Sequence, residues 1–429
     1  MIQTTAEKSP APTADEIEAV RDAGARAAAA AKELRHASDG DVVGVIRRIA
    51  ALLHQEQAAI LAANAEDVAK AAANGLSTGM LDRLRLDPDR LAGMAEQLEV
   101  LAATPAPPRD RPIRTLPSGE RVLQRRVPVG VVGAIFEARP NVPIDLGSQV
   151  LTARSAVVMR TGAAAIGTSA CLVDRAVAPA LSEGGLSPDA VQLLRLPGHG
   201  VADALTTQPD LIPLVVVRGS GDVTRRLSAL GARSGVQVLS HADGGGVLYV
   251  DAAADVELAE KLIRDGLDRL GVCNRLNLLL LHESLSADVV NRLQDTLSRL
   301  DIAISREPYD HPLGYEWALD AGSEATVTVA KVGGARAAAE LADAETSGLA
   351  ATICTTDPVA AQTFLDSYGG TAVLWNTSTR LVDGFKMLGL PETGINVDRT
   401  LGPRGPVTFP DLGMRQFLVV PADAPGYGD

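Results

Sequence analysis

The sequence predicts an α/β protein whose core is formed by two parallel sheets. From residue 127 onward, short runs of apolar residues alternate with amphipathic stretches of helical spacing. Strands that are apolar on both faces are typical of parallel sheets that helices cover on each side. The chain has 429 residues, of which 46% are hydrophobic, so two or three domains are expected rather than one core.

The region before residue 104 is predicted to be helical. Thr13-Ala-Asp-Glu16 resembles a capping box, and apolar residues follow it at the spacing of one helix face. A second helix carries apolar residues from Val42 to Leu53 on one face. The proline-rich segment 104–117 is expected to end this region as a surface connection.

The two sheets are predicted on either side of a junction near residues 251–256. The apolar runs expected as strands of the first sheet are 127–136, 156–159, 191–194, 211–217 and 247–250. The helices between them are expected near 166–182, 199–207 and 221–231. The strands of the second sheet are expected near 276–281, 325–330, 350–354 and 371–375. Two further segments, 119–126 and 414–420, either pair as an arm outside these sheets or form an edge strand and a tail.

The overall charge limits the classes of partner. A net charge of −13 and a pI near 5.0 argue against nucleic acid or an anionic membrane, although a local basic pocket for a phosphorylated ligand is compatible with them. No signal sequence is recognised and no apolar run approaches the roughly 18 residues of a membrane span, so a cytoplasmic protein is expected. The three cysteines are widely separated and lack metal-ligand spacing, so neither a disulfide nor a metal site is indicated.

Cys273 is the first candidate for a catalytic residue. It follows a predicted helix and a glycine, and the apolar run 276–281 comes directly after it, so its thiol is expected at the end of a sheet. A thiolate is strongly nucleophilic near neutral pH and is suited to capture an acyl group. The competing interpretation of an isolated cysteine is a small buried apolar residue.

A second candidate lies where the first long strand runs into a turn, at Glu137-Ala-Arg-Pro-Asn-Val142. Pro140 fixes the backbone before Asn141, whose amide is expected to donate a hydrogen bond into a cleft. Acyl transfer to a thiol builds negative charge on the carbonyl oxygen. An amide and the backbone N–H of the nucleophile would together stabilise that charge.

A standard dinucleotide fingerprint is absent, because no GxGxxG follows a predicted strand. A weaker candidate is the turn Val217-Arg-Gly-Ser-Gly-Asp222, where backbone N–H groups at a helix start can hold a pyrophosphate. Turns between strands and helices are often rich in glycine, so this turn alone does not indicate a cofactor.

The segment Val127-Pro-Val-Gly-Val-Val-Gly-Ala-Ile-Phe-Glu-Ala-Arg-Pro-Asn-Val142 resembles the signature of the γ-glutamyl phosphate reductase family, within the aldehyde dehydrogenase superfamily. Similar segments follow in the same order at Val272-Cys-Asn274, at Trp375-Asn-Thr-Ser-Thr-Arg380 with Asp383-Gly384, and at Arg404-Gly-Pro406. The resemblance implies an aldehyde-dehydrogenase-like fold of two Rossmann-like domains and a small β oligomerisation arm. The implied boundaries are a dinucleotide-binding domain at 1–118 and 128–252, a catalytic domain at 253–400, and an arm at 119–127 and 401–429.

The resemblance also implies a role for each matching residue. Cys273 would form an acyl thioester, and Asn141 would be the oxyanion donor. The cofactor would be NADPH, with NADH as the alternative, and the implied cofactor-binding residues are Arg160, Thr161, Gly162, Arg218, Gly219, Ser220 and Gly221. The implied substrate-binding residues are Glu137, Arg139, Asn274, Asn277, Ser378, Thr379 and Arg380.

The implied reaction is reduction of an acyl phosphate to an aldehyde, with L-glutamyl 5-phosphate of proline biosynthesis as the expected substrate. A hydrolytic relative carries a glutamate base where this chain has Leu239-Ser-His-Ala-Asp-Gly-Gly-Gly246, so phosphate suits the acyl-enzyme better than water. The implied partners are a small acyl phosphate, a kinase that supplies it, and further copies of the chain in a homodimer or homotetramer.

Several positions depart from the family pattern. Asn277 stands where the family has a glutamate, and Leu349 stands where it has a histidine, so weaker binding of a charged amino-acid head group is expected. Two alternatives therefore stay open: a divergent relative that reduces another acyl phosphate or a carrier-bound thioester, and a non-catalytic relative. A cysteine hydrolase is disfavoured, because none of the six histidines lies in a motif that would pair it with Cys273.

Overall fold

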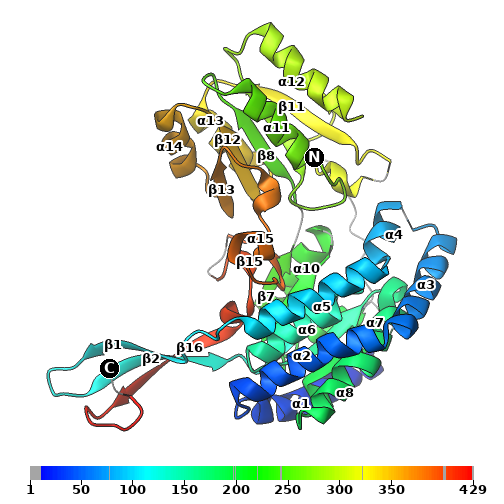
Figure 1. The fold of residues 1–429 in the computed structure, drawn as a ribbon, viewed down its shortest axis with the longest axis vertical. Helices are drawn as coiled ribbons and strands as arrows, with labels where there is room; N and C mark the ends of the chain where they lie inside the picture. Colours follow the sequence, from blue (N-terminus) through cyan, green and yellow to red (C-terminus); the bar gives the residue numbers. More distant parts are fainter. Residues whose placement is uncertain are drawn as a thin grey trace.

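The computed structural model of the chain describes residues 11–76, 78–196, 198, 200–219, 221–241, 244–320, 322–399 and 402–427. The described chain forms two lobes, and a thin arm extends from the lower one (Figure 1). The lower lobe holds the N-terminal helices and the first parallel sheet, and the upper lobe holds the second parallel sheet. The predicted α/β class with two parallel sheets is confirmed.

Helices form the beginning of the lower lobe. They are α1 (Ala14–Leu34), α2 (Asp39–Gln55), α3 (Gln57–Ala73), α4 (Thr78–Leu84) and α5 (Pro88–Ala103). The predicted capping box of α1 is confirmed, because the Glu16 backbone N–H donates to the Thr13 hydroxyl (3.2 Å) and the Thr13 N–H donates to the Glu16 carboxylate (2.8 Å). The predicted second helix is confirmed as α2, which buries its apolar face from Val42 to Leu53.

The first sheet has the order β5-β4-β3-β6-β7, with every neighbouring pair parallel. Its strands are β3 (Val131–Phe136), β4 (Ala156–Thr161), β5 (Val191–Leu194), β6 (Leu214–Arg218) and β7 (Gln237–His241). Its crossover helices are α6 (Val142–Thr152), α7 (Ile166–Leu172), α8 (Ala178–Glu183), α9 (Gly200–Leu205) and α10 (Gly221–Ser234). The chain proceeds outward from β3 in one direction and then returns to β6 on its other side. Ligands of such sheets bind at the carboxyl ends of the strands where the order reverses, here after β3 and β6.

The second sheet has the order β10-β11-β9-β8-β12-β13 and is also parallel. Its strands are β8 (Gly246–Val250), β9 (Leu276–His282), β10 (Ala303–Ser305), β11 (Thr326–Val332), β12 (Ala350–Cys354) and β13 (Ala372–Trp375). Its helices are α11 (Val256–Gly266), α12 (Ala287–Arg299), α13 (Ala335–Glu345) and α14 (Pro358–Ser367).

Strand β8 corrects the expected junction between the sheets. It was expected to end the first domain at residue 252, but it pairs with β9 and β12 and therefore belongs to the second sheet. The apolar run of β8 is buried in either arrangement, so its composition does not indicate which sheet it joins.

The arm is a three-stranded antiparallel sheet of β1 (Asp110–Thr115), β2 (Arg121–Pro128) and β16 (Gly413–Val420). Pairing of the two outlying segments is confirmed, but the expected surface connection at 104–117 is wrong for residues 110–115. Strand β1 is an edge strand with a register shift at Pro112, a setting in which proline is tolerated. The expected long strand 127–136 is also two strands, because the chain turns at Gly130, where φ is +100°.

Between the lobes lie the short helix α15 (Gly384–Leu388) and a ribbon of β14 (Gly394–Asn396) and β15 (Gly405–Val407) (Figure 1). The side chains of Val407, Phe409 and Leu412 pack into the core of the lower lobe. The last part of the chain therefore leaves the upper lobe and returns to the lower lobe before it forms β16.

One helical run, Ala163–Glu183, is long and apolar enough to cross a membrane by length and composition. This differs from the expectation that no segment would approach that length. Half of its apolar window is buried inside the protein, where it packs against α2 and α3, as core helices of folded domains do.

Candidate active site

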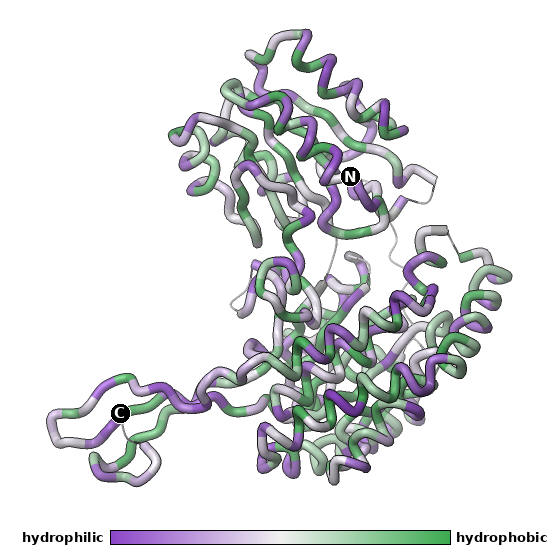
Figure 2. Tube along the Cα trace, viewed as in Figure 1, coloured by the Kyte–Doolittle hydropathy of each residue, from purple (hydrophilic) through white to green (hydrophobic). Residues whose placement is uncertain are grey.

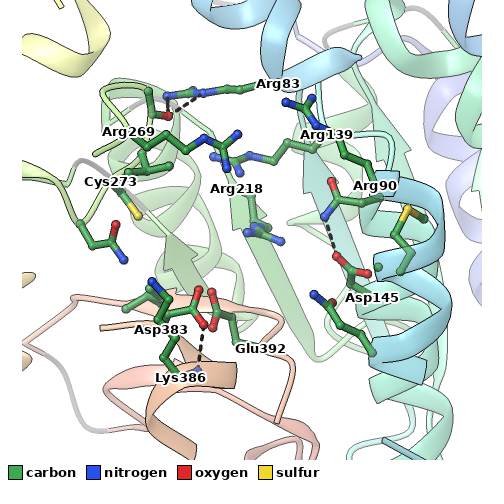
Figure 3. A pocket seen from close by; sticks show the side chains of 18 of the residues that line it. Arg83, Arg90, Arg139, Asp145, Arg218, Arg269, Cys273, Asp383, Lys386 and Glu392 are labelled. Carbon is green, nitrogen blue, oxygen red and sulfur yellow. Dashed lines mark hydrogen bonds between the residues drawn. The ribbon is translucent and has the colours of Figure 1, made fainter. Parts of the chain in front are cut away.

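A cavity of about 560 Å³ is lined by both residues expected to perform the chemistry, Cys273 and Asn141. Figure 3 shows the Cys273 side chain at this cavity. Residues of the lower lobe reach it from α4 and α5, from the turn between β3 and α6, and from the end of β6. Residues of the upper lobe reach it from the loop before β9, and the segment around α15 forms the remaining wall. The cavity thus includes the carboxyl ends of β3 and β6, where the strand order reverses.

Cys273 lies in the loop between α11 and β9, and its backbone is packed tightly. Its carbonyl oxygen accepts a hydrogen bond from the Gly245 N–H (2.7 Å). A Cβ atom at Gly244 would lie 2.2 Å from that oxygen, so a larger residue at 244 would displace the nucleophile loop. The thiol side packs against an apolar cluster that includes Leu349 and Val382.

Opposing charges act on the Cys273 thiol. Burial raises its pKa, and the positive charge of Arg139 lowers it. The carboxylates of Glu316 and Glu392 raise this pKa further, and Arg218 lowers it. The two arginines therefore favour the thiolate, which is the reactive form.

Asn141 begins α6, and its amide Nδ2 donates to the Asp145 carboxylate over 2.5 Å. Burial raises the pKa of Asp145 to about 6, although the bond from Asn141 and the charge of Arg218 oppose the rise. An amide nitrogen carries two N–H donors, so one can hold the side chain while the other serves a ligand. Asp145 was not identified from the sequence; its position four residues after Asn141, on the same helix face, was the available signal.

The cavity is strongly cationic, in contrast to the whole chain. Its basic residues are Arg83, Arg85, Arg90, Arg139, Arg218, Arg269, Arg380 and Lys386. Its acidic residues are Asp145, Asp383 and Glu392. An excess of arginine in a cleft favours an anionic ligand.

Arg139 faces this cavity, and the turn that precedes it is strained. Ala138 is buried and has a φ of +44°, a left-handed conformation that costs a non-glycine residue about 1 kcal/mol or more. Burial and the neighbouring charges of Arg218 and Arg83 lower the pKa of Arg139 to about 9. Strain of this kind persists where the surrounding structure holds a functional side chain in place.

Arg83 of α4 joins the two lobes beside Cys273. Its guanidinium donates to the Gly271 carbonyl, two residues before Cys273, from Nη2 (2.9 Å) and Nε (3.2 Å). A second contact joins Arg269 to Asp82 over 3.4 Å. These residues were not identified in the sequence, because nothing local indicates that α4 meets a loop almost two hundred residues later.

Two of the expected substrate-binding residues in the upper lobe line the cavity, Asn274 and Arg380. Arg380 donates to the Asp268 carboxylate (2.6 Å) and to the Asn274 side chain. Ser378 accepts a bond from the Arg380 N–H, and the Thr379 hydroxyl donates to the Asn274 carbonyl (2.9 Å). Within the described part of the chain, Ser378 and Thr379 therefore hold Asn274 and Arg380 in place, and they do not themselves line the cavity.

The expected substrate contact at Asn277 is corrected. Asn277 is 1% exposed, donates to the Tyr315 carbonyl (2.7 Å) and accepts from the Trp317 N–H (3.2 Å). Leu349 is also buried, inside an apolar cluster. Asn277 and Leu349, the two departures from the family pattern, therefore support the structure around the site. The cavity still carries the carboxylates of Asp145, Asp383 and Glu392, which could pair with an ammonium group.

The expected cofactor-binding residues divide into two groups. Arg160 and Thr161 end β4 and are buried, and the Arg160 Nε and Thr161 Oγ1 atoms have no hydrogen-bond partner within the described chain. Glu137 lies beside Gly162, and its charge raises the pKa of Arg160, which burial lowers. Unpaired buried donors at the carboxyl end of a parallel strand fit the hydroxyl and phosphate oxygens of a dinucleotide.

The second group follows β6. Arg218 lines the cavity of Cys273, Gly219 lies in the turn, and Gly221 begins α10. Ser220 lies outside the described residues. Among the residues that the structure describes, no cluster of histidine, cysteine and acidic side chains suits a metal ion.

Glu316 is a further residue that the sequence analysis missed. Its carboxylate accepts a hydrogen bond from the Gly244 N–H, and Gly244 packs on the backbone of Cys273. The loop that carries Glu316 is fixed by Asn277, which bonds the residues on either side of it. A carboxylate from residue 316 thus reaches the nucleophile loop from a part of the chain distant in sequence.

Comparisons with known proteins agree with this geometry. The sequence pattern of the aldehyde dehydrogenase family matches residues 3–312. The chain is 34% identical over 427 residues to the gamma-glutamyl phosphate reductase of Sphingopyxis alaskensis, covering 98% of each chain. The crystal structure of gamma-glutamyl phosphate reductase from Thermotoga maritima has a TM-score of 0.85 at 24% identity, over 94% of this chain and 99% of that one. An engineered glycolyl-CoA reductase with bound NADP⁺ has a TM-score of 0.71 at 16% identity, over 94% and 96%.

Proposed function

The chain belongs to the aldehyde dehydrogenase family, and from this membership we propose that it reduces L-glutamyl 5-phosphate to L-glutamate 5-semialdehyde and phosphate. One observation carries the proposal: Cys273 lies beside Arg139 and Arg218 in an arginine-rich cavity of a chain similar to gamma-glutamyl phosphate reductases over nearly its whole length. A cysteine supplies the acyl acceptor, and the arginines suit an anionic substrate.

The first step is attack of the Cys273 thiolate on the acyl carbon. The C–O bond to phosphate then breaks, phosphate leaves with the electron pair, and an acyl thioester remains on Cys273. The free N–H of the Asn141 amide and the backbone N–H of Cys273 stabilise the negative charge on the carbonyl oxygen, while Asp145 holds the amide. A nicotinamide cofactor, when bound, supplies the hydride that converts the thioester to the aldehyde and releases the thiolate.

NADPH is proposed as the physiological form of the cofactor. The unpaired Arg160 guanidinium nitrogen and Thr161 hydroxyl at the end of β4 would bind the adenosine ribose and its substituents. The basic side chain of Arg160 favours a 2′-phosphate there. The similarly folded glycolyl-CoA reductase with bound NADP⁺ supports a nicotinamide cofactor for the fold.

The proposed setting is proline biosynthesis in the cytoplasm, with a kinase supplying the acyl phosphate. Three free cysteines are compatible with a reducing compartment. The arm would join copies of the chain into a homodimer or homotetramer, because its strands expose apolar side chains; Figure 2 shows apolar segments on it. These residues are Ile113, Met414, Phe417 and Val419.

The test is oxidation of glutamate-5-semialdehyde by the purified chain with NADP⁺. The expected result is turnover that requires phosphate or arsenate, because the segment 239–246 carries no glutamate to activate water. Rapid release of free glutamate without phosphate would assign the chain to the hydrolytic dehydrogenases instead.

A further inference from the structure

We propose that Arg139 and Arg218 form the binding site for the phosphoryl group of the substrate, and for inorganic phosphate in the reverse direction. This inference rests on the proposed function and names the residues that receive its leaving group. It moves Arg218 from the cofactor, where the sequence analysis placed it, to the substrate.

The sheet brings the two arginines together. Arg218 is the last residue of β6, and it pairs in register with Phe136, the last residue of the neighbouring strand β3. Arg139 follows Phe136 by three residues. Figure 3 shows both side chains in the middle of the cavity, between Cys273 and Asp145.

Within the described residues, neither arginine is neutralised by a partner. In the described part of the chain, the Arg139 guanidinium makes no hydrogen bond or ion pair, and the Arg218 Nε atom is buried without a partner. The Glu392 carboxylate attracts both arginines without bonding either of them. Two unpaired guanidinium groups close enough to repel each other are costly to bury. An anion between them would offset both charges and supply the missing acceptors.

The other arginines of the cavity differ, because most are already occupied. Arg83 is bonded to the Gly271 carbonyl, Arg90 to Asp82 and Arg380 to Asp268. Arg85 also lines the cavity but is exposed to solvent. Arg139 and Arg218 are therefore the cavity arginines that combine burial with open donors.

Their position matches the course of the reaction. Both charges lower the pKa of the Cys273 thiol, so they lie near the sulfur that attacks the acyl carbon. When the C–O bond breaks, the oxygen that takes the electron pair belongs to the phosphoryl group, and two guanidinium groups stabilise the charge that it gains. In the reverse direction, phosphate held there attacks the thioester, and the Cys273 thiolate leaves.

The binding test uses inorganic phosphate as the probe and needs no turnover. The full-length chain is treated with iodoacetamide over a range of phosphate concentrations at constant ionic strength, and modification of Cys273 is followed by peptide mass spectrometry. Phosphate is expected to protect Cys273, and Arg139→Gln and Arg218→Gln are expected to raise the protecting concentration about tenfold or more. Arg299→Gln, an exposed arginine of α12 outside the cavity, is the matched control and should leave it unchanged. If Arg218→Gln does not fold, Arg218→Lys replaces it in the test. Lysine keeps the charge but lacks the planar guanidinium, so its protecting phosphate concentration should lie between those of the wild type and a variant without the charge.

Two outcomes would overturn the proposal. One is an equal protecting concentration in the wild type and in both Gln variants, and the other is an equal shift in the control variant Arg299→Gln. A third measurement separates substrate from cofactor: in semialdehyde oxidation, Arg218→Gln should raise KM for phosphate and not KM for NADP⁺. The opposite result would return Arg218 to the cofactor. If phosphate protects Cys273 in a manner that depends on the two arginines, but the chain does not oxidise the semialdehyde, the phosphate site is supported and the proposed substrate is rejected.

Discussion

Cys273 and Asn141 approach the same cavity from different lobes, and each depends on a neighbour that has no role of its own in bond breaking. Gly244 allows the Cys273 backbone to pack where it does, and Asp145 fixes the Asn141 amide. At the scale of single residues, the site is therefore a small number of reacting groups held by close, specific contacts.

Asn141→Ala is expected to lower kcat about 10²- to 10³-fold, the usual effect of removing one oxyanion donor, with little change in KM. Steady-state kinetics with saturating cofactor provide the measurement. Asp145→Asn is the companion variant, since it keeps an acceptor for the Asn141 amide and should retain much more activity. A large rise in KM at normal kcat in Asn141→Ala would instead assign Asn141 to binding of the substrate before reaction.

Asp145 should make the stability of the chain depend on pH. Its folded pKa of about 6 lies above the ordinary 3.8, so folding disfavours the ionised form, and the free energy of unfolding should fall as pH rises from about 4 to 6. A shift of about two units corresponds to roughly 3 kcal/mol. Asp145→Asn should lose this dependence and be more stable at pH 7 by denaturant unfolding. The same dependence of the free energy of unfolding on pH in the wild type and in Asp145→Asn would contradict this. Asp89→Asn, at an exposed position, serves as the control.

At the scale of elements, α4 connects the lower lobe to the nucleophile loop. Arg83 bonds the Gly271 carbonyl from two nitrogens, and Arg269 of the same loop reaches back to Asp82. Asn64 of α3 supports this position, because its side chain bonds the backbone of Leu84 and Leu86 on either side of the turn after α4. The loop before β9 is thus held by a helix of the other lobe.

Arg83→Met should loosen that loop while preserving the fold. We expect kcat to fall about tenfold, the effect of losing one charge-assisted hydrogen bond of roughly 1.5 kcal/mol, and amide hydrogen exchange to increase in residues 269–275. Arg85→Met, on the same segment but exposed, is the control. Unchanged exchange in that loop would show that Arg83 does not position it.

At the scale of the whole molecule, the arm exposes large apolar side chains that the single chain does not bury. Phe417 and Val419 of β16 are 57% and 60% exposed. If the arm forms the proposed oligomer, Phe417→Asp combined with Val419→Asp is expected to dissociate it to monomers in sedimentation analysis, because charges would be buried without partners in the interface. The control is Thr115→Asp at the arm's polar end, and an unchanged sedimentation coefficient in the double variant would exclude the arm as an interface.

The sequence predicted the elements well where a pattern is local. The capping box at Thr13, the strands at 191–194 and 350–354, and the pairing of segments 119–126 and 414–420 as an arm are all found. It failed where partners decide the outcome: β8 joins the second sheet because of its neighbours, and β1 forms despite its proline because it lies at an edge.

The site followed the same rule. Cys273 and Asn141, the residues proposed to react, were recognisable from their segments, and the structure brings them to one cavity. Asn277 was expected to contact substrate, but its side chain bonds the backbone of Tyr315 and Trp317 instead. Only the fold brings that loop next to Asn277. Arg83, Asp145 and Glu316 could not be found from sequence patterns alone, because their contacts depend on burial and on pairs distant along the chain.

The most direct test of the proposed chemistry is mass spectrometry of the acyl-enzyme. The chain is mixed with glutamate-5-semialdehyde and NADP⁺ without phosphate, quenched in acid, and digested. A thioester at Cys273 predicts a glutamyl group attached to the peptide that contains Cys273, absent in Cys273→Ser and removed when phosphate is added before the quench. Production of NADPH with an unmodified Cys273 peptide, or undiminished turnover in Cys273→Ser, would contradict a thioester mechanism at this residue.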